Sequence, residues 1–194
     1  MSKTMIDSTT PSPARIARSR WIGAFVTLAI VAADQLIKLF VTGPLALQAR
    51  IGDPIEIVSF FRLQYAENYG VSLGMLQAES EAMRWGLVAL TTAISLGVVI
   101  WIFKEKLRGD IIALAIILGG AIGNIIDRVR LGYVVDYADF HVGGYSPFMI
   151  FNLADAAITI GVLLLVARAL LHDRAKSKTI DPSHPPAAST GQGD

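Results

Sequence analysis

The chain carries four long apolar stretches, separated by segments that are richer in polar residues. They run from about Trp21 to Thr42, from Trp85 to Phe103, from Ile111 to about Ile126, and from Phe148 to Leu171. A membrane-spanning helix needs roughly 20 mostly apolar residues. The pattern therefore predicts four transmembrane helices, the third of which reaches full length if Asp127 and Arg128 belong to its end.

The first apolar stretch has some features of a cleaved signal peptide, because basic residues precede it and small residues follow it. Against that interpretation, Asp34 and Lys38 lie inside the stretch, which is also long for the apolar core of a signal peptide. We therefore interpret it as a retained transmembrane helix.

The connection 43–84 is too regular for a plain linker. Mostly apolar residues recur at every second position from Ile55 to Tyr65, after the turn signal Gly52-Asp53-Pro54. The sequence therefore predicts an all-α polytopic membrane protein, with a small extracytoplasmic β-sheet between the first and the second helix. Residues 67–74 are interpreted as a short interfacial helix or a loop that dips toward the bundle.

Basic residues predict the orientation in the membrane. Four precede the first stretch, three lie between the second and third, and three follow the fourth, whereas the 129–147 connection has one. Because basic flanks stay inside, we expect both termini in the cytoplasm and both 43–84 and 129–147 at the outer face. The tails 1–14 and 176–194, rich in small and polar residues, are predicted to be disordered around a membrane domain at 15–175.

Composition narrows the function. The chain is 53% hydrophobic, with a mean hydropathy of +0.53, which is typical of a polytopic membrane protein. A net charge of +1 gives no field for nucleic acid, so no nucleic-acid partner is expected. Without cysteine there is no disulfide, thiolate nucleophile or Cys-based metal site, and the three histidines have no metal-ligand spacing.

Two aspartates lie where the chain otherwise avoids charge. Asp136 follows the third apolar stretch, and Asp155 lies one turn inside the fourth. A carboxylate in or beside hydrocarbon is costly, so it is a functional candidate by default. Two that meet can share a proton and activate water without metal, cofactor or covalent intermediate. The ordinary alternatives are a solvated loop residue for Asp136 and a helix cap for Asp155.

Further polar residues share the faces of two helices: Gly120, Asn124 and Arg128 on the third, and Asn152, Asp155 and Thr159 on the fourth. The glycines by themselves indicate close helix packing. Asn152 is the better placed helix cap. Arg128 either extends to the headgroups or binds a carboxylate, a lipid phosphate or a peptide carbonyl.

Three more charged residues have structural interpretations. Asp34 and Lys38 stand at i, i+4, which favours a self-neutralising pair near the membrane. Asp127 is a rival to Asp136 as the partner of Asp155, but its position beside Arg128 favours a paired, ionised group.

Taken together, these residues resemble the lipoprotein signal peptidase family, the bacterial signal peptidase II. The resemblance covers almost all of residues 21–171 and consists of five ordered blocks: Asp34-Gln35-x-x-Lys38, Asn68-x-Gly70, Gly119-Gly120-Ala121-Ile122-Gly123-Asn124-Ile125-Ile126-Asp127-Arg128, Val134-Val135-Asp136-Tyr137 and Phe151-Asn152-Leu153-Ala154-Asp155.

The resemblance implies an intramembrane aspartyl endopeptidase of the bacterial inner membrane, with Asp136 and Asp155 as the catalytic dyad. Its substrates would be prolipoproteins, cleaved before a cysteine that carries a diacylglyceryl group, and globomycin-type cyclic peptides would inhibit it. Asp34 and Lys38 would support the site, and the substrate would be lined by Asn68, Gly120, Asn124, Arg128, Asn152 and Ala156. We expect a monomer that contacts membrane lipids.

Some positions depart from the family pattern. Tyr69 stands where the family often has Thr, and Leu73 stands where it has Phe, so these two positions are expected to alter the detailed shape of the pocket. Tyr137 replaces a common Phe, which we interpret as a conservative change.

Three rival functions stay open. A small proton-coupled carrier also uses buried charges, but carriers usually show internal repeats and sites at the bilayer midplane. A non-catalytic assembly factor would use the polar residues to bind partner helices. A metal site formed by Asp136, Asp139 and His141 lacks a further ligand at suitable spacing.

Overall fold

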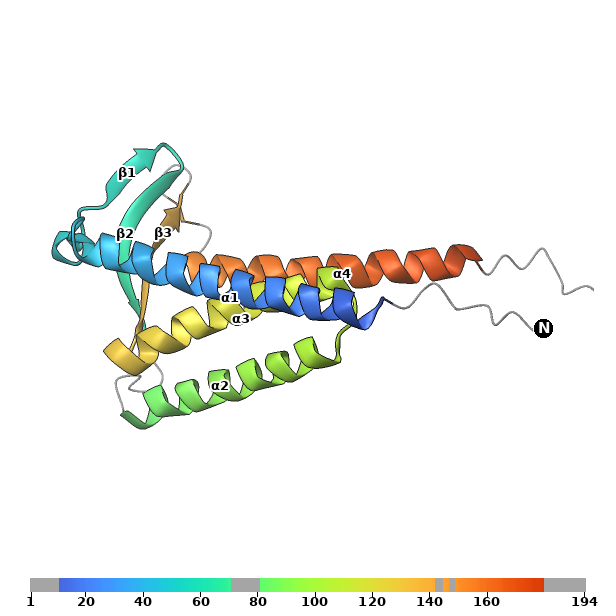
Figure 1. Ribbon diagram of the computed structural model, residues 1–194. Helices are drawn as coiled ribbons and strands as arrows, with labels where there is room; N and C mark the ends of the chain where they lie inside the picture. The colour runs from blue at the N-terminus through green and yellow to red at the C-terminus, as the bar shows by residue number, and fades with distance from the viewer. Residues whose placement is uncertain (1–10, 71–80, 142–144, 147–148, 180–194) are drawn as a thin grey trace, which may run out of the picture.

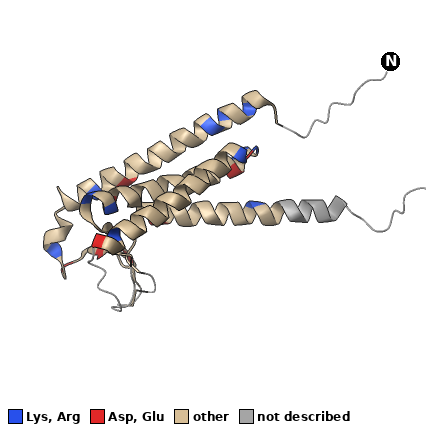
Figure 2. Cartoon of the chain, turned by 90° about the horizontal axis from the view of Figure 1, so that it is seen from below, with Lys and Arg blue, Asp and Glu red and all other residues tan. Residues whose placement is uncertain are grey.

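The computed structural model describes residues 11–70, 81–141, 145–146 and 149–179, with side chains described as far as residue 171. Its four long helices are α1 (Pro13–Thr42), α2 (Glu81–Lys104), α3 (Arg108–Leu131) and α4 (Leu153–Thr179). Each is long and apolar enough to cross a membrane, and charged residues gather toward the two ends of the bundle (Figure 2). The chain is therefore a multi-pass membrane protein.

The helix boundaries differ from the predicted ones in physically simple ways. α3 includes Asp127 and Arg128, as the length of a membrane span requires. α4 begins at Leu153 rather than Phe148, because Asn152 caps the helix and Phe151 before it forms a bridge with Ala138. α1 begins inside the predicted N-terminal tail, and α4 extends past residue 175. The remaining parts of the predicted tails, residues 1–10 and 180–194, lie outside the described residues.

α3 is the central helix of the bundle, and α1, α2 and α4 all pack on it (Figure 1). Half of its most apolar window is buried, compared with 6% for α2. Close approach depends on glycines: a Cβ on Gly119 would lie 2.9 Å from Ile30 of α1, and one on Gly120 would meet the carbonyl oxygen of Ala154 in α4. The predicted packing role of these glycines is therefore confirmed.

A three-stranded antiparallel sheet lies at one end of the bundle, in the order β1 (Ile55–Val58), β2 (Phe61–Asn68) and β3 (Val134–Phe140) (Figure 1). The predicted alternating segment forms β1 and β2. The prediction that the sheet lies wholly between the first two helices was wrong, because β3 follows α3. Asp136 is consequently a strand residue and not a loop residue. All of β3 except Phe140 is buried, so it lacks the exposed-buried alternation of a surface strand.

The sheet is fastened to the end of α1 by a small core. Its buried members come from α1, from the 3-10 helix Leu47–Arg50, and from β2 and β3: Val41, Leu47, Tyr65, Val135, Tyr137 and Ala138. This core fixes β3 beside the ends of α1 and α3. The strand register then pairs Ala66 with Asp136 and Asn68 with Val134, which brings the end of β2 to the acidic pair.

Candidate active site

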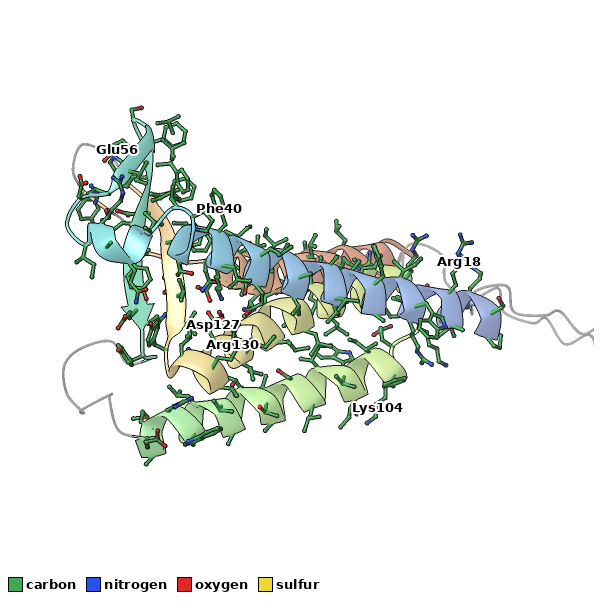
Figure 3. All side chains as sticks on the ribbon, turned by 60° about the vertical axis from the view of Figure 1, so that its left-hand side comes forward. Arg18, Phe40, Glu56, Lys104, Asp127 and Arg130 are labelled. Carbon is green, nitrogen blue, oxygen red and sulfur yellow. The ribbon has the colours of Figure 1, made fainter. Side chains whose placement is uncertain are left out.

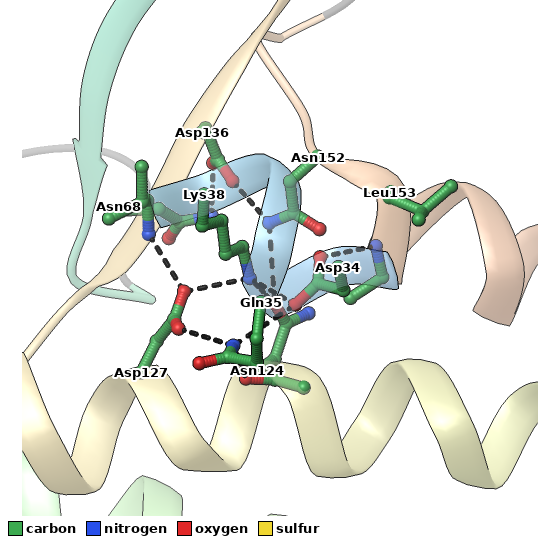
Figure 4. Close-up of polar contacts among 12 residues, drawn as sticks. Asp34, Gln35, Lys38, Asn68, Asn124, Asp127, Asp136, Asn152 and Leu153 are labelled. Atoms are coloured by element: carbon green, nitrogen blue, oxygen red, sulfur yellow. Dashed lines mark hydrogen bonds and ion pairs between the residues drawn. The ribbon is translucent and has the colours of Figure 1, made fainter. Parts of the chain in front are cut away.

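Asp136 lies on β3 with 2% of its surface exposed. Each carboxylate oxygen accepts one amide hydrogen bond: Oδ1 from Asn152 Nδ2 at 2.6 Å, and Oδ2 from Asn68 Nδ2 at 3.0 Å (Figure 4). Asn68 is itself held, because its Oδ1 accepts the backbone N–H of Gly70 at 2.8 Å. Segments that are far apart in the sequence therefore orient one carboxylate.

Asp155 lies in the first turn of α4 and is half-buried. Asn124 of α3 donates from Nδ2 to its Oδ1 at 2.8 Å. Asn152 and Asp155 also form a reciprocal cap: Asp155 N–H donates to Asn152 Oδ1 at 3.0 Å, and Asn152 N–H donates to Asp155 Oδ2 at 3.3 Å. Asn152 is the cap, as expected, and Asp155 shares in the capping, which corrects the contrast drawn between them.

The two carboxylates interact electrostatically. Burial raises the pKa of Asp136 to about 6, and the charge on Asp155 adds to that rise. Hydrogen bonds from Asn68 and Asn152 oppose the rise, as does the charge of Lys38. The raised pKa keeps the proton on Asp136 up to about pH 6, well above the range of an ordinary aspartate. A protonated carboxyl beside a second carboxylate is the arrangement required for concerted acid and base catalysis.

Lys38 is the centre of a buried ion cluster beside the pair. Its Nζ lies 2.8 Å from Asp34 Oδ2 and 2.7 Å from Asp127 Oδ2, and it donates to Asn124 Oδ1 at 3.3 Å (Figure 4). Asp34 is fully buried, Asp127 is 3% exposed and Lys38 is 4% exposed. The interpretation of Asp34 and Lys38 as an isolated pair was therefore incomplete. Asp127 is indeed paired, although with Lys38.

Both carboxylates of this cluster hold backbone next to the acidic pair. Asp34 Oδ1 accepts the N–H of Ala154 at 3.1 Å, one residue before Asp155. Asp127 Oδ2 accepts the N–H of Val135 at 3.2 Å, one residue before Asp136. Lys38 therefore ties the strand and the helix that carry the two aspartates to a single charged group.

Two residues near the pair were not assigned such roles from the sequence. Gln35 Nε2 donates to Asp127 Oδ1 at 2.9 Å and to the carbonyl of Gly123 at 3.3 Å, so it joins α1 to α3. Its place in the Asp34-Gln35-x-x-Lys38 block was the available signal. Tyr137 Oη accepts the N–H of Leu153 at 3.2 Å. Because a phenylalanine cannot do this, Tyr137 is more than a conservative replacement.

The remaining predicted site residues lie close by. Arg128 interacts electrostatically with Asp155, Asp136 and Asp127. Among the described atoms, its buried Nε has no hydrogen-bond partner. Gly120 is buried in the contact between α3 and α4. A mostly apolar pocket of about 480 Å³ reaches Asp155, and it is lined by Phe140, Met149, Phe151, Asp155, Ala156, Thr159 and Ile160.

Asp139 and His141 have other partners than a shared metal. Asp139 Oδ2 accepts from Arg62 Nε at 2.7 Å, and His141 Nε2 lies 3.3 Å from Glu56. Within the described residues, no three histidine or acidic side chains lie close enough to hold a metal ion. Val71 to Gly74, including the divergent Leu73, lie outside the described residues.

Comparison with known proteins places this arrangement in a family. A family model described as signal peptidase (SPase) II matches residues 26–171. The chain is 55% identical over 157 residues to the lipoprotein signal peptidase of Sphingopyxis alaskensis, covering 80% of this chain and 90% of that one. It is also 55% identical over 152 residues to the lipoprotein signal peptidase of Rhizorhabdus wittichii, covering 78% and 87%.

The fold agrees with the sequence comparison. A solved bacterial membrane enzyme has a TM-score of 0.66 and 30% identity, covering 80% of this chain and 90% of that chain. The family model includes both aspartates, the buried ion cluster and every predicted site residue. This chain therefore belongs to the signal peptidase II family.

Proposed function

We propose that this protein is an aspartyl endopeptidase that removes the signal peptide of bacterial prolipoproteins, cleaving before the diacylglyceryl-modified cysteine. One observation carries the mechanism: Asn152 donates a hydrogen bond to Asp136 from its side chain and one to Asp155 from its backbone, so it holds both carboxyls. Burial raises the pKa of Asp136, and the charge of Asp155 adds to that rise. The relatives that share 55% identity with this chain are lipoprotein signal peptidases, which supports the substrate class.

The unequal environments of the two carboxyls assign their roles. Asp136 is buried and has a raised pKa, so it holds the proton and donates it to the scissile carbonyl oxygen. Half-buried Asp155 acts as the general base and takes a proton from the attacking water. As the tetrahedral intermediate collapses, Asp155 gives its proton to the leaving amine nitrogen. Asp136 recovers its own proton from the intermediate's hydroxyl, which restores the carbonyl.

The polar groups around the dyad bind the peptide. We assign substrate contacts to Asn68, Asn124, Arg128, Asn152 and Ala156, whereas Gly120 shapes the site from below by letting α3 approach α4. Among these, Arg128 has hydrogen-bonding capacity left for a peptide carbonyl or a lipid oxygen, since its Nε has no partner among the described atoms. The pocket that runs from Asp155 along Ala156 and Ile160 fits an apolar part of the substrate. Asp34 and Lys38 support the dyad through the backbone that they hold.

In the proposed orientation both termini are in the cytoplasm of the bacterial cell, and the dyad is at the outer face of the inner membrane. Figure 3 places Arg18 and Lys104 at one end of the bundle and Asp127 at the other. Basic flanks at the first end favour the cytoplasm. The lipid-anchored cleavage site of a prolipoprotein then lies at the depth of the dyad.

The tip of the hairpin between β1 and β2 is apolar, which supports a position of the sheet on the outer leaflet. The tip exposes three large apolar side chains, Ile57, Val58 and Phe60, by 54%, 44% and 55%. Hairpin turns in water usually carry Gly, Asn, Asp or Ser. An apolar tip is instead suited to the membrane interface, beside an incoming lipidated peptide. We further propose a monomer with disordered tails, inhibited by globomycin-type cyclic peptides that occupy the dyad.

The decisive experiment is cleavage of a diacylglyceryl-modified prolipoprotein by the purified protein in detergent or lipid. Wild type is compared with Asp136→Asn, Asp155→Asn and Asp127→Asn, after each variant is shown to be folded. We expect wild type to cleave at the lipidated cysteine. The cleavage rate should fall by about 1,000-fold or more in Asp136→Asn and in Asp155→Asn, because each variant lacks one of the two carboxyls that transfer protons. Asp127→Asn should retain measurable cleavage, since it acts through Val135.

Folded wild-type protein that fails to cleave would overturn the proposal and favour a non-catalytic assembly role. Activity that survives in Asp136→Asn and disappears in Asp127→Asn would make Asp127 the partner of Asp155.

A further inference from the structure

A groove lies between α1 and α2, at the end of the bundle opposite the dyad. It has a volume of about 360 Å³, and its floor is formed by Leu118 and Ile122 of α3. Both α1 and α2 pack on α3. The groove walls are apolar apart from Arg20 and Thr27. The hydroxyl of Thr27 already donates its hydrogen bond to the carbonyl of Ala115 at 3.0 Å.

Arg20 lies at the mouth of this groove. Its Nη2 donates to the carbonyl of Phe103 at the end of α2 at 2.5 Å, and its guanidinium lies 5.5 Å from the ring centroid of Phe103. Its buried Nε has no partner among the described atoms. Since an arginine has five N–H donors, Arg20 keeps donors for an anion while its position is fixed against α2.

The neighbouring aromatic residues indicate the depth of Arg20 in the bilayer. Trp21 is 78% exposed on α1, and Trp101 is 51% exposed on α2. Exposed tryptophans gather at the level of the lipid headgroups. Figure 3 shows Arg18 and Lys104 at this same end. A phosphate at Arg20 therefore lies at headgroup level, and the groove continues from it toward the bilayer interior.

We propose that this groove binds an anionic phospholipid of the cytoplasmic leaflet, with its phosphate on Arg20 and one acyl chain between α1 and α2. Of the lining residues that the structure describes, Arg20 is the one charged group, so its charge is complementary to a phosphate. The positive charge of Arg20 also repels a basic peptide segment, so the basic cytoplasmic end of a substrate signal peptide is a less suitable occupant of the groove. The inference rests on the orientation given under the proposed function.

A second groove at this end provides a contrast. It is lined by residues that include Glu105, Asp110 and Arg168, and Arg168 Nε is held by Asp110 at 2.5 Å. With two carboxylates and an arginine already paired, it is unsuited to an anionic headgroup. The charge pattern therefore distinguishes the α1–α2 groove from general contact with lipid.

The test is native mass spectrometry of the delipidated full-length protein with dioleoyl phosphatidylglycerol or dioleoyl phosphatidylcholine as probes. We expect wild type to retain phosphatidylglycerol preferentially. Arg20→Gln should weaken that binding by about fivefold or more, as expected for the loss of one basic group near lipid phosphate. Arg18→Gln, on the same helix outside the groove lining, should change it less than about twofold. Arg20→Lys keeps the charge and should bind in between.

A second, independent test fills the groove with a larger side chain and leaves the charge of the protein unchanged. Ala24 lines the groove and Ala29 of the same helix does not. We expect Ala24→Phe to reduce retention of both lipids and Ala29→Phe to leave it unchanged. Equal losses in Arg20→Gln and Arg18→Gln, or full retention in Ala24→Phe, would overturn the inference. Lipid retention is measured without cleavage, so it can succeed or fail independently of the peptidase assignment.

Discussion

The ammonium group of Lys38 lies 2.7 Å from the carboxylate of Asp127, and the two side chains are only 5% and 4% exposed. The same ammonium lies 2.8 Å from Asp34, which is fully buried. Removing one member of a buried ion cluster leaves charge without compensation, which is far more costly than losing a surface pair. Lys38 is therefore expected to matter for stability as well as for the geometry of the dyad.

We predict that Lys38→Met lowers the free energy of unfolding by about 3–5 kcal/mol, because two buried carboxylates lose their cation. Adding Asp127→Asn to Lys38→Met should recover part of the loss. As a control, Arg50→Met breaks the exposed Arg50–Asp53 pair and should cost less than about 1 kcal/mol. Denaturant titration in detergent measures all three. A Lys38→Met variant as stable as Arg50→Met would contradict the prediction.

The hydrogen bond from Asn68 to Asp136 should set the pH range of activity. This bond favours the ionised carboxylate and so lowers the pKa of Asp136, against the rise caused by burial and Asp155. Because the proton on Asp136 is needed for catalysis, wild-type kcat/KM should fall as pH rises through the pKa of Asp136, about 6.

In Asn68→Ala, the fall of kcat/KM on the alkaline side of the pH profile (the alkaline limb) should move to higher pH by about one unit. The reason is that a hydrogen bond to a charged group is worth roughly 1.5–3 kcal/mol. Gln64→Ala on the same strand is the control and should leave the limb in place. A pH profile of kcat/KM makes the measurement, and a limb that shifts downward in Asn68→Ala would refute the role assigned to this bond.

Asp136 should reduce stability at neutral pH, because its folded pKa of about 6 is above its ordinary value of 3.8. The folded state therefore binds the proton more tightly, and the cost of ionisation grows as pH rises from about 4 to about 6. Asp136→Asn should stabilise the protein by about 1–2 kcal/mol above pH 6, after discounting a hydrogen bond that an amide cannot accept.

This gain should vanish near pH 4, where the wild-type carboxyl is itself protonated in the folded state. Thermal unfolding of both proteins across this pH range measures the effect. Asp53→Asn, whose side chain is 80% exposed, serves as the control and should show no such gain. An equal gain at pH 4 and pH 7.5 would count against the linkage.

Gly120 should be intolerant of a side chain. A Cβ there would meet the carbonyl oxygen of Ala154 and lie 2.9 Å from Ile158 Cγ1, so α3 and α4 would have to separate at the turn that carries Asp155. We predict that Gly120→Ala costs about 1–3 kcal/mol and lowers cleavage. Gly97→Ala on α2, where a Cβ has open space, should stay within about 1 kcal/mol of wild type. Parallel unfolding and cleavage assays compare the two, and equal behaviour would reject the packing argument.

The sequence by itself determined the four spans, because a helix must satisfy its backbone hydrogen bonds within one apolar segment and so leaves a local signal. It also indicated strand structure over residues 55–65 through local alternation, although it did not locate the turn that divides this segment into β1 and β2. It singled out Asp136, Asp155, Asp34 and Lys38 as costly charges. The tertiary structure decided what these charges contact. The third strand was missed because β3 is buried almost throughout and pairs with residues about 70 positions earlier.

The links from Asp34 to Ala154 and from Asp127 to Val135 join residues that are 120 and 8 positions apart. No periodicity records such contacts, since they depend on how α1, α3 and the sheet meet. The groove at Arg20 has the same origin: the arginine is visible in the sequence, but the space beside it exists only where α1 and α2 both rest on α3.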